Sequence, residues 1–400
     1  MAFTYKIINY NTLLQLIQMK IVLNTILAKQ AGPGGYHVAL NFFYKTLEDK
    51  ENEWFYFVSK EFDEKMKGQE KGLDVKHYYV FHTQPDFRHY WADKRRIRQI
   101  EADVCPDVVY SILAPSYHTF KTVEVMRCAN AWTVVGGVND YALAVTPVKL
   151  KYRYFMKAKI TQMLMRHTKY FVTQSNIAKQ CILRTVHTEP ENICVVSNVL
   201  PEKYLSLNTE KVAHDDFNMV YASSPAVHKD YLILPQVANL LINKFGMKNF
   251  KIHYTIPDYA NELPILNELM KRYGVEDYFE NHGFLNRDNL AELYSKCDLG
   301  LFPSLLETFS VTLLEYMYFK MPIVATNLDF NKEVAEDAAI YFEPHNAEDF
   351  AEKIYSVYND RNLKLNLLKN AEVRLSKYSN NSDKFKETVN FLREVADRRK

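Results

Sequence analysis

The segment LFPSLLETFSVTLLE, residues 301–315, is the stretch of this chain that is most informative about its fold. Apolar residues precede a Pro-Ser pair and then return at helical spacing, so the segment predicts a short strand, a loop and a helix. Ser310 is a favourable residue to cap that helix, whose first amide groups would then be free to meet an anion. Glu307 lies on the loop, and Glu315 lies about two turns into the helix. Taken alone, the two Glu residues are also compatible with an ordinary helix whose charged side chains face water.

The same alternation of apolar runs and helical spacing extends from this segment in both directions. Strands that alternate with helices predict parallel sheets covered on both faces, and two such sheets give two Rossmann-like domains. Ligands of these folds bind outside the carboxyl ends of the strands, so the sequence predicts an α/β protein with its site in the cleft between two domains. The strands are expected at 21–27, 54–58, 108–112, 132–135, 170–173 and 193–196, and then at 217–222, 250–256, 299–302, 323–325 and 339–342.

The chain is long enough for two domains. Its 400 residues exceed what one ordinary hydrophobic core accommodates. A polar stretch at 206–216 separates the two series of strands. We therefore expect a first domain over residues 1–207, a second over 208–377, and a charged helix over 378–400. Residues 1–18 have no place in the sheet pattern, so we expect that they are a dispensable extension or that translation naturally starts at Met19.

Cysteine usage and hydropathy indicate the compartment. The five cysteines are spread over the chain without a C-x-x-C pair, which argues against a disulfide framework or a zinc site and favours a reducing compartment. No apolar run approaches the roughly 18 residues of a membrane-spanning helix, and the first residues lack the features of a signal peptide. We expect a cytoplasmic protein, at most peripheral at the inner face of the membrane.

Positive charge is concentrated in the first half of the chain. Residues 1–200 hold 26 Lys and Arg against 18 Asp and Glu, whereas residues 201–400 hold 24 against 30. This asymmetry suggests that the first half meets something anionic. Residues 141–188 contain nine Lys or Arg and no acidic residue. Their basic part, 149–184, leaves two interpretations open: a solvated helix face, or an amphipathic surface that docks on anionic lipid. Nucleic acid is not an expected partner.

The second half of the chain resembles retaining GT-B glycosyltransferases of family 4. Their pattern is Pro-Ser-x-x-Glu-x-Phe-Gly, a second Glu eight residues after the first, and then Gly-x-Pro-Val-Val. This chain has Pro303-Ser304, Glu307, Phe309, Glu315 and Met-Pro-Ile-Val at 321–324. The resemblance continues at 283–285, 293–298, 331–334 and 337–344, and it is close over about 120 residues. It implies the GT-B fold, with the helix at 378–400 crossing back to the first domain.

The resemblance implies an activity and a role for several residues. A hexose-type sugar would pass from a UDP- or GDP-linked donor to a saccharide or lipid-linked saccharide, with retention of anomeric configuration, in surface polysaccharide biosynthesis. Glu307 would hold the transferred sugar through its hydroxyls, Glu315 would bind the ribose, and the peptide around Leu285 would lie near the base. Amides at the start of the following helix would meet the distal phosphate. The remaining donor-binding residues that the resemblance implies are Ser304, Phe309, Ser310, Val311 and Thr312.

Lys229 follows the strand expected at 217–222 and is the second expected catalytic residue. A Lys that faces the cleft can neutralise a departing diphosphate, although a Lys at such a place is more often simply solvated. The family has its diphosphate Lys at this position and commonly an Arg five residues earlier, where this chain has Ser224. A subset of the family lacks that Arg. No Asp-x-Asp motif lies at a strand end, so we expect neither a metal nor another cofactor.

Two loops of the first half carry weaker signals. Gly-Pro-Gly-Gly at 32–35 follows the first strand, and by itself it favours a plain strand-to-helix turn over a phosphate-binding loop. The paired glycines of the family make Gly34 and Gly35 candidate donor contacts. Asn139 follows the strand expected at 132–135, where many relatives have a His that contacts the donor sugar or the acceptor. Asn cannot act as a base, but the resemblance implies a retaining transfer in which the departing phosphate itself takes the proton of the acceptor.

Three functions compete. The first is an active retaining glycosyltransferase. The second is a degenerate relative that binds a nucleotide-sugar or a partner without turnover, which Ser224 and Asn139 motivate. The third is another GT-B enzyme, such as a nucleotide-sugar epimerase, against which the segment 301–315 argues. Donor hydrolysis in the absence of acceptor separates the first two.

Overall fold

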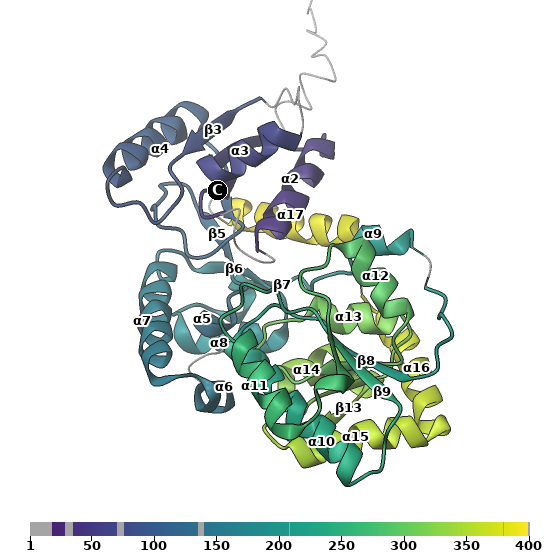
Figure 1. Ribbon diagram of the computed structural model, residues 1–400. Coiled ribbons are helices and arrows are strands. Elements are labelled where there is room, and N and C mark those ends of the chain that lie inside the picture. Colours follow the sequence, from purple (N-terminus) through teal and green to yellow (C-terminus); the bar gives the residue numbers. More distant parts are fainter. Residues whose placement is uncertain are drawn as a thin grey trace, which may run out of the picture.

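The computed structural model describes residues 18–28, 35–69, 76–134, 140–207, 209–378 and 380–398. Figure 1 shows two lobes, each with a central sheet flanked by helices. The α/β fold with two Rossmann-like domains is therefore confirmed. The domain boundaries expected at 207 and 377 stay predictions. The expected extension lies almost entirely in residues 1–17, outside the described residues.

The first lobe contains a seven-stranded sheet in the order β3-β2-β1-β4-β5-β6-β7. Every strand pair in it is parallel, because a helix or a long connection returns the chain to the same end of the sheet each time. The strands are β1 (Lys20–Thr25), β2 (Glu53–Ser59), β3 (Tyr78–Phe81), β4 (Val108–Ser111), β5 (Glu124–Arg127), β6 (Tyr170–Thr173) and β7 (Ile193–Val195).

The strand expected at 132–135 is wrong. Residues 131–134 form the short helix α5 (Ala131–Val134), and the strand of this part of the sheet is β5, a few residues earlier. Both ends of β5 are charged and buried, with Glu124 6% and Arg127 4% exposed. A strand with charged residues at two of its four positions has no apolar run to reveal it, whereas Thr-Val-Val at 133–135 offers a short one.

Helices of the first lobe cover both faces of this sheet (Figure 1). They are α2 (Gly35–Glu48), α3 (Lys60–Gln69), α4 (Tyr90–Val104), α6 (Asp140–Val145), α7 (Val148–Met165) and α8 (Asn176–Thr185), besides α5. The short helix α9 (Glu202–Leu205) follows, and its Tyr204 packs into the core of the second lobe. None of the helices in the described part of the chain is both long and apolar enough to cross a membrane.

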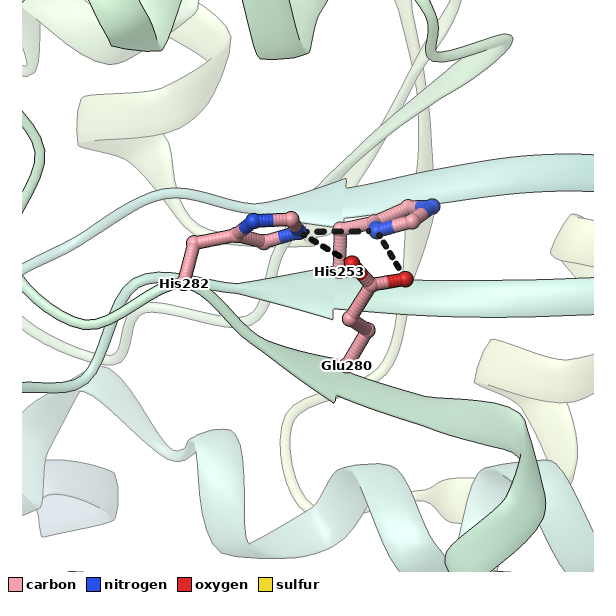
Figure 2. A group of neighbouring side chains, drawn as sticks. All are labelled: His253, Glu280 and His282. Carbon is pink, nitrogen blue, oxygen red and sulfur yellow. Dashed lines mark hydrogen bonds and ion pairs between the residues drawn. The ribbon is translucent and has the colours of Figure 1, made fainter.

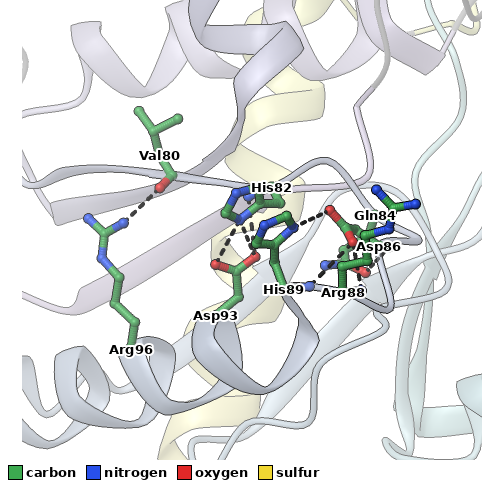
Figure 3. Close-up of polar contacts among 8 residues, drawn as sticks. All are labelled: Val80, His82, Gln84, Asp86, Arg88, His89, Asp93 and Arg96. Carbon is green, nitrogen blue, oxygen red and sulfur yellow. Dashed lines mark hydrogen bonds and ion pairs between the residues drawn. The ribbon is translucent and has the colours of Figure 1, made fainter.

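A polar cluster fixes α4 to the end of β3 (Figure 3). The carboxylate of Asp93 lies 3.1 Å from Nδ1 of His82 and also accepts from its backbone amide. The ring of His89 stacks on His82 with centroids 3.7 Å apart, and its Nδ1 lies 2.8 Å from Asp86. Arg96, one turn further on, donates to the carbonyl of Val80. These contacts hold the start of α4 against the edge of the sheet.

The second lobe contains a six-stranded parallel sheet in the order β10-β9-β8-β11-β12-β13. The five strands expected from the sequence are present. The sixth, β10, has the sequence Phe-Glu-Asn at the sheet edge, with two exposed residues and no apolar run to predict it. The strands are β8 (Phe217–Tyr221), β9 (Phe250–Tyr254), β10 (Phe279–Asn281), β11 (Leu299–Phe302), β12 (Ile323–Thr326) and β13 (Ala339–Phe342).

Seven α-helices in the described residues accompany this sheet. They are α10 (Leu234–Asn243), α11 (Leu263–Tyr273), α12 (Arg287–Ser295), α13 (Val311–Tyr318), α14 (Asp329–Ala335), α15 (Ala347–Asn359) and α16 (Arg361–Leu375).

The helix α17 (Asn381–Asp397) returns to the first lobe, where it lies beside α2 (Figure 1). Its apolar residues Phe391 and Leu392 belong to the same buried cluster as Phe42 and Trp54. Phe385 packs its ring against both, with centroids 5.1 and 6.1 Å away. Each buried side chain of this size contributes about 1.5–3 kcal/mol, so α17 is part of the core of the first lobe. The expected crossing is confirmed.

Candidate active site

A cleft of about 700 Å³ lies between the lobes. The first lobe contributes α2 and residues at the ends of β4, β5 and β7, and α17 forms part of the same wall. The second lobe contributes Glu307, Phe309, Val311 and Glu315 from the segment 301–315. The carboxyl ends of parallel strands thus meet at a cavity large enough for a substrate.

The two expected catalytic residues contact each other. Lys229 ends the short helix η2 (Val227–Lys229) after β8, and its Nζ is ion-paired with Oε1 of Glu307, on the loop after β11. The same oxygen accepts a hydrogen bond of 3.0 Å from the hydroxyl of Ser304. Both charged side chains are mostly buried, with 13% and 14% exposed. A buried charge pair destabilises a protein unless its geometry and further hydrogen bonds offset the lost hydration, and Ser304 supplies one such bond.

The backbone around Lys229 is fixed from two sides. Leu305 donates its amide to the carbonyl of His228 at 2.8 Å, which links the two loops directly. Asp230, in the left-handed region with φ of 50°, lies 3.1 Å from Nδ1 of His345. Burial and the neighbouring Lys229 lower the pKa of His228 to about 4. His228 is therefore neutral at pH 7, and Lys229 is the cation of this loop.

The helix α13 begins at Ser310, as expected, but the expected side-chain cap is absent. Ser310 is the N-cap residue with extended backbone, and its hydroxyl makes no capping hydrogen bond. Val311, the first helical residue, lines the cleft, and Thr312 follows it in the first turn. A helix start whose amides are not capped by its own N-cap side chain favours an anion in front of it.

Glu315 is buried in α13 with 9% exposed, and it still lines the cleft. Its carboxylate accepts a hydrogen bond of 2.9 Å from the hydroxyl of Tyr294. Burial raises the pKa of Glu315, and the hydrogen bond from Tyr294 and the charge of Arg287 oppose this rise. The next residue, Tyr316, lies so close to β11 that a Cβ atom at Gly300 would be only 2.3 Å from its ring. The absence of a side chain at Gly300 thus allows α13 to lie close to the sheet, and this close packing determines how deeply Glu315 is buried.

The other expected site residues lie in different surroundings. Phe309 lines the cleft and packs its ring against Tyr378, 5.7 Å away. Ser304 is 1% exposed and supports Glu307 rather than lining the cleft.

The remaining expected site residues lie outside the segment 301–315. Leu285 does not line the cleft, because it packs against the core beside α13. It follows Gly283, whose φ is 62°. Gly35 begins α2 at the cleft. Gly34 and Asn139 lie outside the described residues.

The basis for choosing Asn139 is not supported, because the strand expected before it is a helix. The strand end that reaches the cleft is that of β5, where Arg127 and Ala129 line the cavity. Sequence reasoning missed Arg127, Asn198 and Lys384. A charged residue inside an otherwise strand-like stretch was the signal for Arg127, and α17 had to be placed in space before Lys384 could be recognised.

Polar contacts hold the Glu307 loop against the first lobe. Thr308 donates its hydroxyl to Oε1 of Gln174 at 2.8 Å, and the hydroxyl of Ser175 donates to the carbonyl of Thr308 at 2.7 Å. The carboxylate of Glu333 accepts from the amides of Asn176 and Ile177, at the start of α8. A carboxylate at a helix start is favourable. The lobes are therefore in direct contact beside the cleft.

A separate cluster of possible metal ligands lies on β9 and β10 (Figure 2). Nδ1 of His253 lies 3.0 Å from Nε2 of His282, and each of these atoms lies 3.6 Å from a carboxylate oxygen of Glu280. Burial is the main cause that lowers the pKa of His253 to about 4. None of the three residues lines the cleft. A metal bound there would be remote from the Lys229–Glu307 pair.

Known proteins resemble this chain in sequence. Residues 189–374 match the family Glycosyl transferases group 1. The N,N'-diacetylbacillosaminyl-diphospho-undecaprenol alpha-1,3-N-acetylgalactosaminyltransferase of Campylobacter jejuni is 26% identical over 54% of this chain and 57% of its own length. The phosphatidylinositol N-acetylglucosaminyltransferase gpi3 subunit of Schizosaccharomyces pombe is 21% identical over 50% of this chain and 43% of its own length. The chain thus aligns with about half the length of these curated relatives.

Solved structures match the whole fold. HepE of Anabaena in complex with UDP superposes with a TM-score of 0.68 at 14% identity, over 94% of this chain and 100% of HepE. The sucrose-phosphate synthase of Thermosynechococcus elongatus gives a TM-score of 0.68 at 12% identity, over 94% of this chain and 99% of its own. The chain therefore has the fold of GT-B glycosyltransferases, and its residues 189–374 match the family Glycosyl transferases group 1.

Proposed function

We propose that this protein transfers a hexose-type sugar from a nucleotide diphosphate sugar to a saccharide or lipid-linked saccharide, with retention of anomeric configuration. The observation that carries the proposal is the ion pair of Lys229 with Glu307, which lines the cleft beside the start of α13. A cation and a helix start suit a diphosphate, and a carboxylate suits sugar hydroxyls. The UDP complex of HepE, a protein of the same fold, supports a nucleotide-linked donor.

The chemistry follows from these positions. The bond between the anomeric carbon and the diphosphate breaks, and Lys229 with the first amides of α13 stabilises the negative charge on the leaving group. Glu307 holds the sugar hydroxyls, and Glu315 holds the ribose hydroxyls. The acceptor oxygen forms its bond on the face that the diphosphate leaves, and its proton passes to a phosphate oxygen. Retention results because attack and departure share one face.

The acceptor and the setting are proposed from the relatives. Their names include a diphospho-undecaprenol-linked saccharide and phosphatidylinositol, both of which are lipids that carry phosphate. Assembly of a surface polysaccharide at the cytoplasmic face of a membrane is the setting that we infer. The alternative is a relative that binds a nucleotide-sugar without turnover. Ser224 favours it, because the site then has one positive charge fewer on the leaving group than family members that have an Arg there.

Binding and hydrolysis of donors test the proposal. Purified protein is screened against UDP- and GDP-sugars by thermal shift, because a ligand raises the unfolding temperature by mass action. The donor that binds is then incubated without acceptor, and release of UDP or GDP is followed. Slow release supports an active transferase. Binding without any release favours the alternative, and no binding of any nucleotide-sugar would refute both.

We expect activity to survive removal of divalent metals. Lys229 and the start of α13 already supply positive charge for the diphosphate, so no metal is needed there. Nucleotide release is measured before and after treatment with EDTA. A His282→Ala variant serves as a control, because any metal held by the His253 cluster would affect stability rather than turnover. Complete loss with EDTA and rescue by Mn²⁺ or Mg²⁺ in that variant would contradict the assignment of Lys229.

The helix α7 supports the proposal of a membrane-facing side. Its buried side chains are only Thr161 and Met165, whereas Tyr152 and Phe155 are 70% and 56% exposed. Basic residues lie between these exposed apolar side chains, and Lys159 lies over the ring of Phe155. Exposed apolar groups amid positive charge suit the interface of an anionic bilayer. We propose that α7 makes this contact.

Replacing the basic residues of α7 with Gln is expected to weaken binding to anionic vesicles by at least tenfold, because each Lys or Arg at an anionic surface contributes about 1 kcal/mol. Co-sedimentation is measured with anionic and with neutral vesicles, at low and at high salt. The α7 variant changes Lys149, Lys151, Arg153, Lys157 and Lys159 to Gln. The control variant changes five exposed Lys residues of the second lobe to Gln, namely Lys248, Lys271, Lys320, Lys332 and Lys369. Equal binding to neutral and anionic vesicles, or none to either, would leave α7 as a solvated face.

A further inference from the structure

Two positively charged side chains meet on the first-lobe wall of the cleft. Arg127 is the last residue of β5, and Lys384 lies in the first turn of α17. Arg127 Nη2 and Lys384 Nζ each lie 3.3 Å from Oδ1 of Asn198, which follows β7. All three residues line the cleft. One amide oxygen is thus the shared hydrogen-bond acceptor of two cations.

No carboxylate pairs with either cation among the ion pairs within residues 18–28, 35–67, 76–134, 140–207, 209–378 and 380–398. Each of the four carboxylates that line the cleft has another partner: Glu48 and Glu202 are paired with Lys45, Glu307 with Lys229, and Glu315 with the hydroxyl of Tyr294. The positive charge of Arg127 and Lys384 is therefore left without an acidic partner in this wall.

This arrangement destabilises the free protein. Arg127 is 4% exposed, and Lys384 is half-buried. Burial is the main cause that lowers the pKa of Lys384 to about 7, and the charge of Arg127 contributes to this shift. Burial also lowers the pKa of Arg127. Two like charges in a low dielectric cost free energy unless an anion compensates them, and groups perturbed in this way concentrate at binding sites.

We propose that Arg127, Lys384 and Asn198 bind a phosphate group of the acceptor, so that the acceptor is a phosphate-bearing molecule. The inference rests on the proposed function, because it names the acceptor class of the same cleft. The planar guanidinium can give two parallel hydrogen bonds to a phosphate, and the ammonium adds a point charge beside it.

The position of the pair favours the acceptor over the donor. The groups assigned to the donor diphosphate, Lys229 and the first turn of α13, belong to the second lobe. Arg127 ends β5 and Asn198 follows β7, both in the first-lobe sheet, and Lys384 belongs to the helix that packs on that lobe. A cleft of about 700 Å³ has the size of a cavity that holds a substrate of drug-like dimensions or larger. The acceptor phosphate would therefore lie on the wall opposite the donor.

The test uses inorganic pyrophosphate as the probe in the presence of saturating UDP or GDP, whichever binds, so that the donor phosphate site is occupied. Affinity is measured by calorimetry on the full chain. We expect wild-type protein to bind the probe and Lys384→Met to bind it about tenfold to 100-fold more weakly, the scale of one charge-assisted hydrogen bond. The control Lys386→Met removes an exposed Lys from the same helix and should bind as wild type does. Arg127→Gln is a second variant, used if its thermal unfolding shows that it folds.

The outcomes separate the acceptor site from the donor site and from the proposed function. Equal probe affinity in Lys384→Met and wild type, or no probe binding to wild type, would overturn the inference. A loss of UDP or GDP affinity in Lys384→Met would also overturn it, because the pair would then serve the donor. If no nucleotide binds at all, the proposed function fails. The pyrophosphate affinities of the variant and the wild type, measured without nucleotide, then still decide whether the pair binds phosphate.

Discussion

Replacing Glu307 with Gln is expected to lower the turnover number by about 100-fold or more, the scale of losing one preorganised electrostatic contact in a transition state. Gln keeps the shape of the side chain, and its amide oxygen can still accept the hydrogen bond from Ser304. The charge that balances Lys229 and holds the sugar hydroxyls is lost. Lys229 is then freed from its ion pair, so the affinity for UDP or GDP should stay the same or rise.

Turnover and nucleotide affinity are therefore measured together for Glu307→Gln. Glu352→Gln, which changes an exposed residue of α15, is the matched control and should behave as wild type in both assays. Unchanged turnover in Glu307→Gln would remove Glu307 from the mechanism. Loss of nucleotide binding in this variant would assign Glu307 to donor binding alone.

Replacing Lys229 with Met is expected to lower turnover by about 100- to 1,000-fold, because the leaving diphosphate loses its cation in a partly buried site. Unlike Glu307→Gln, this variant should also bind UDP or GDP more weakly, by about tenfold, since the diphosphate is the group that we propose Lys229 contacts. It also leaves Glu307 mostly buried without its cation, so the free energy of unfolding should fall.

The double variant separates the two effects of Lys229. Adding Glu307→Gln to Lys229→Met removes the uncompensated carboxylate and should restore the unfolding temperature without restoring turnover. The rate effects of the two changes should not add, because the residues contact each other. Lys332→Met, at an exposed position of α14, is the control. Full activity in Lys229→Met would mean that the start of α13 alone stabilises the leaving group.

Most of the fold was accessible from the sequence because parallel strands buried on both faces are apolar runs. Three strands were not predicted. β5 has ionisable residues at both ends, β10 is an exposed edge strand, and β3 is a four-residue edge strand that is only partly buried although its residues are apolar. The buried carboxyl group of Glu124 is tolerated because burial raises its pKa to about 8, so that it is mostly protonated at pH 7. It also accepts a hydrogen bond from Ser111 on the neighbouring strand, a contact that depends on the sheet register and not on local sequence.

The second-lobe wall of the site was also accessible, since Glu307, Val311 and Glu315 lie within one continuous segment. The first-lobe wall was not. Arg127 and Lys384 are far apart in the chain and share only Asn198, and the contact of Thr308 with Gln174 spans 134 positions. No local sequence pattern reveals contacts between residues so far apart in the chain. These contacts form only when both lobes and α17 are in place.

The return of α17 to the first lobe also determines the order in which the protein is completed during synthesis. A chain normally folds domain by domain as it emerges from the ribosome. Here the core around Phe42 and Trp54 lacks the side chains of Phe385 and Phe391 until the whole second lobe has been made. The second lobe can close its own core first. The first lobe therefore begins to fold first and completes its core last. Until then, the apolar surface that α17 covers in the folded protein stays exposed, so it can bind chaperones or aggregate.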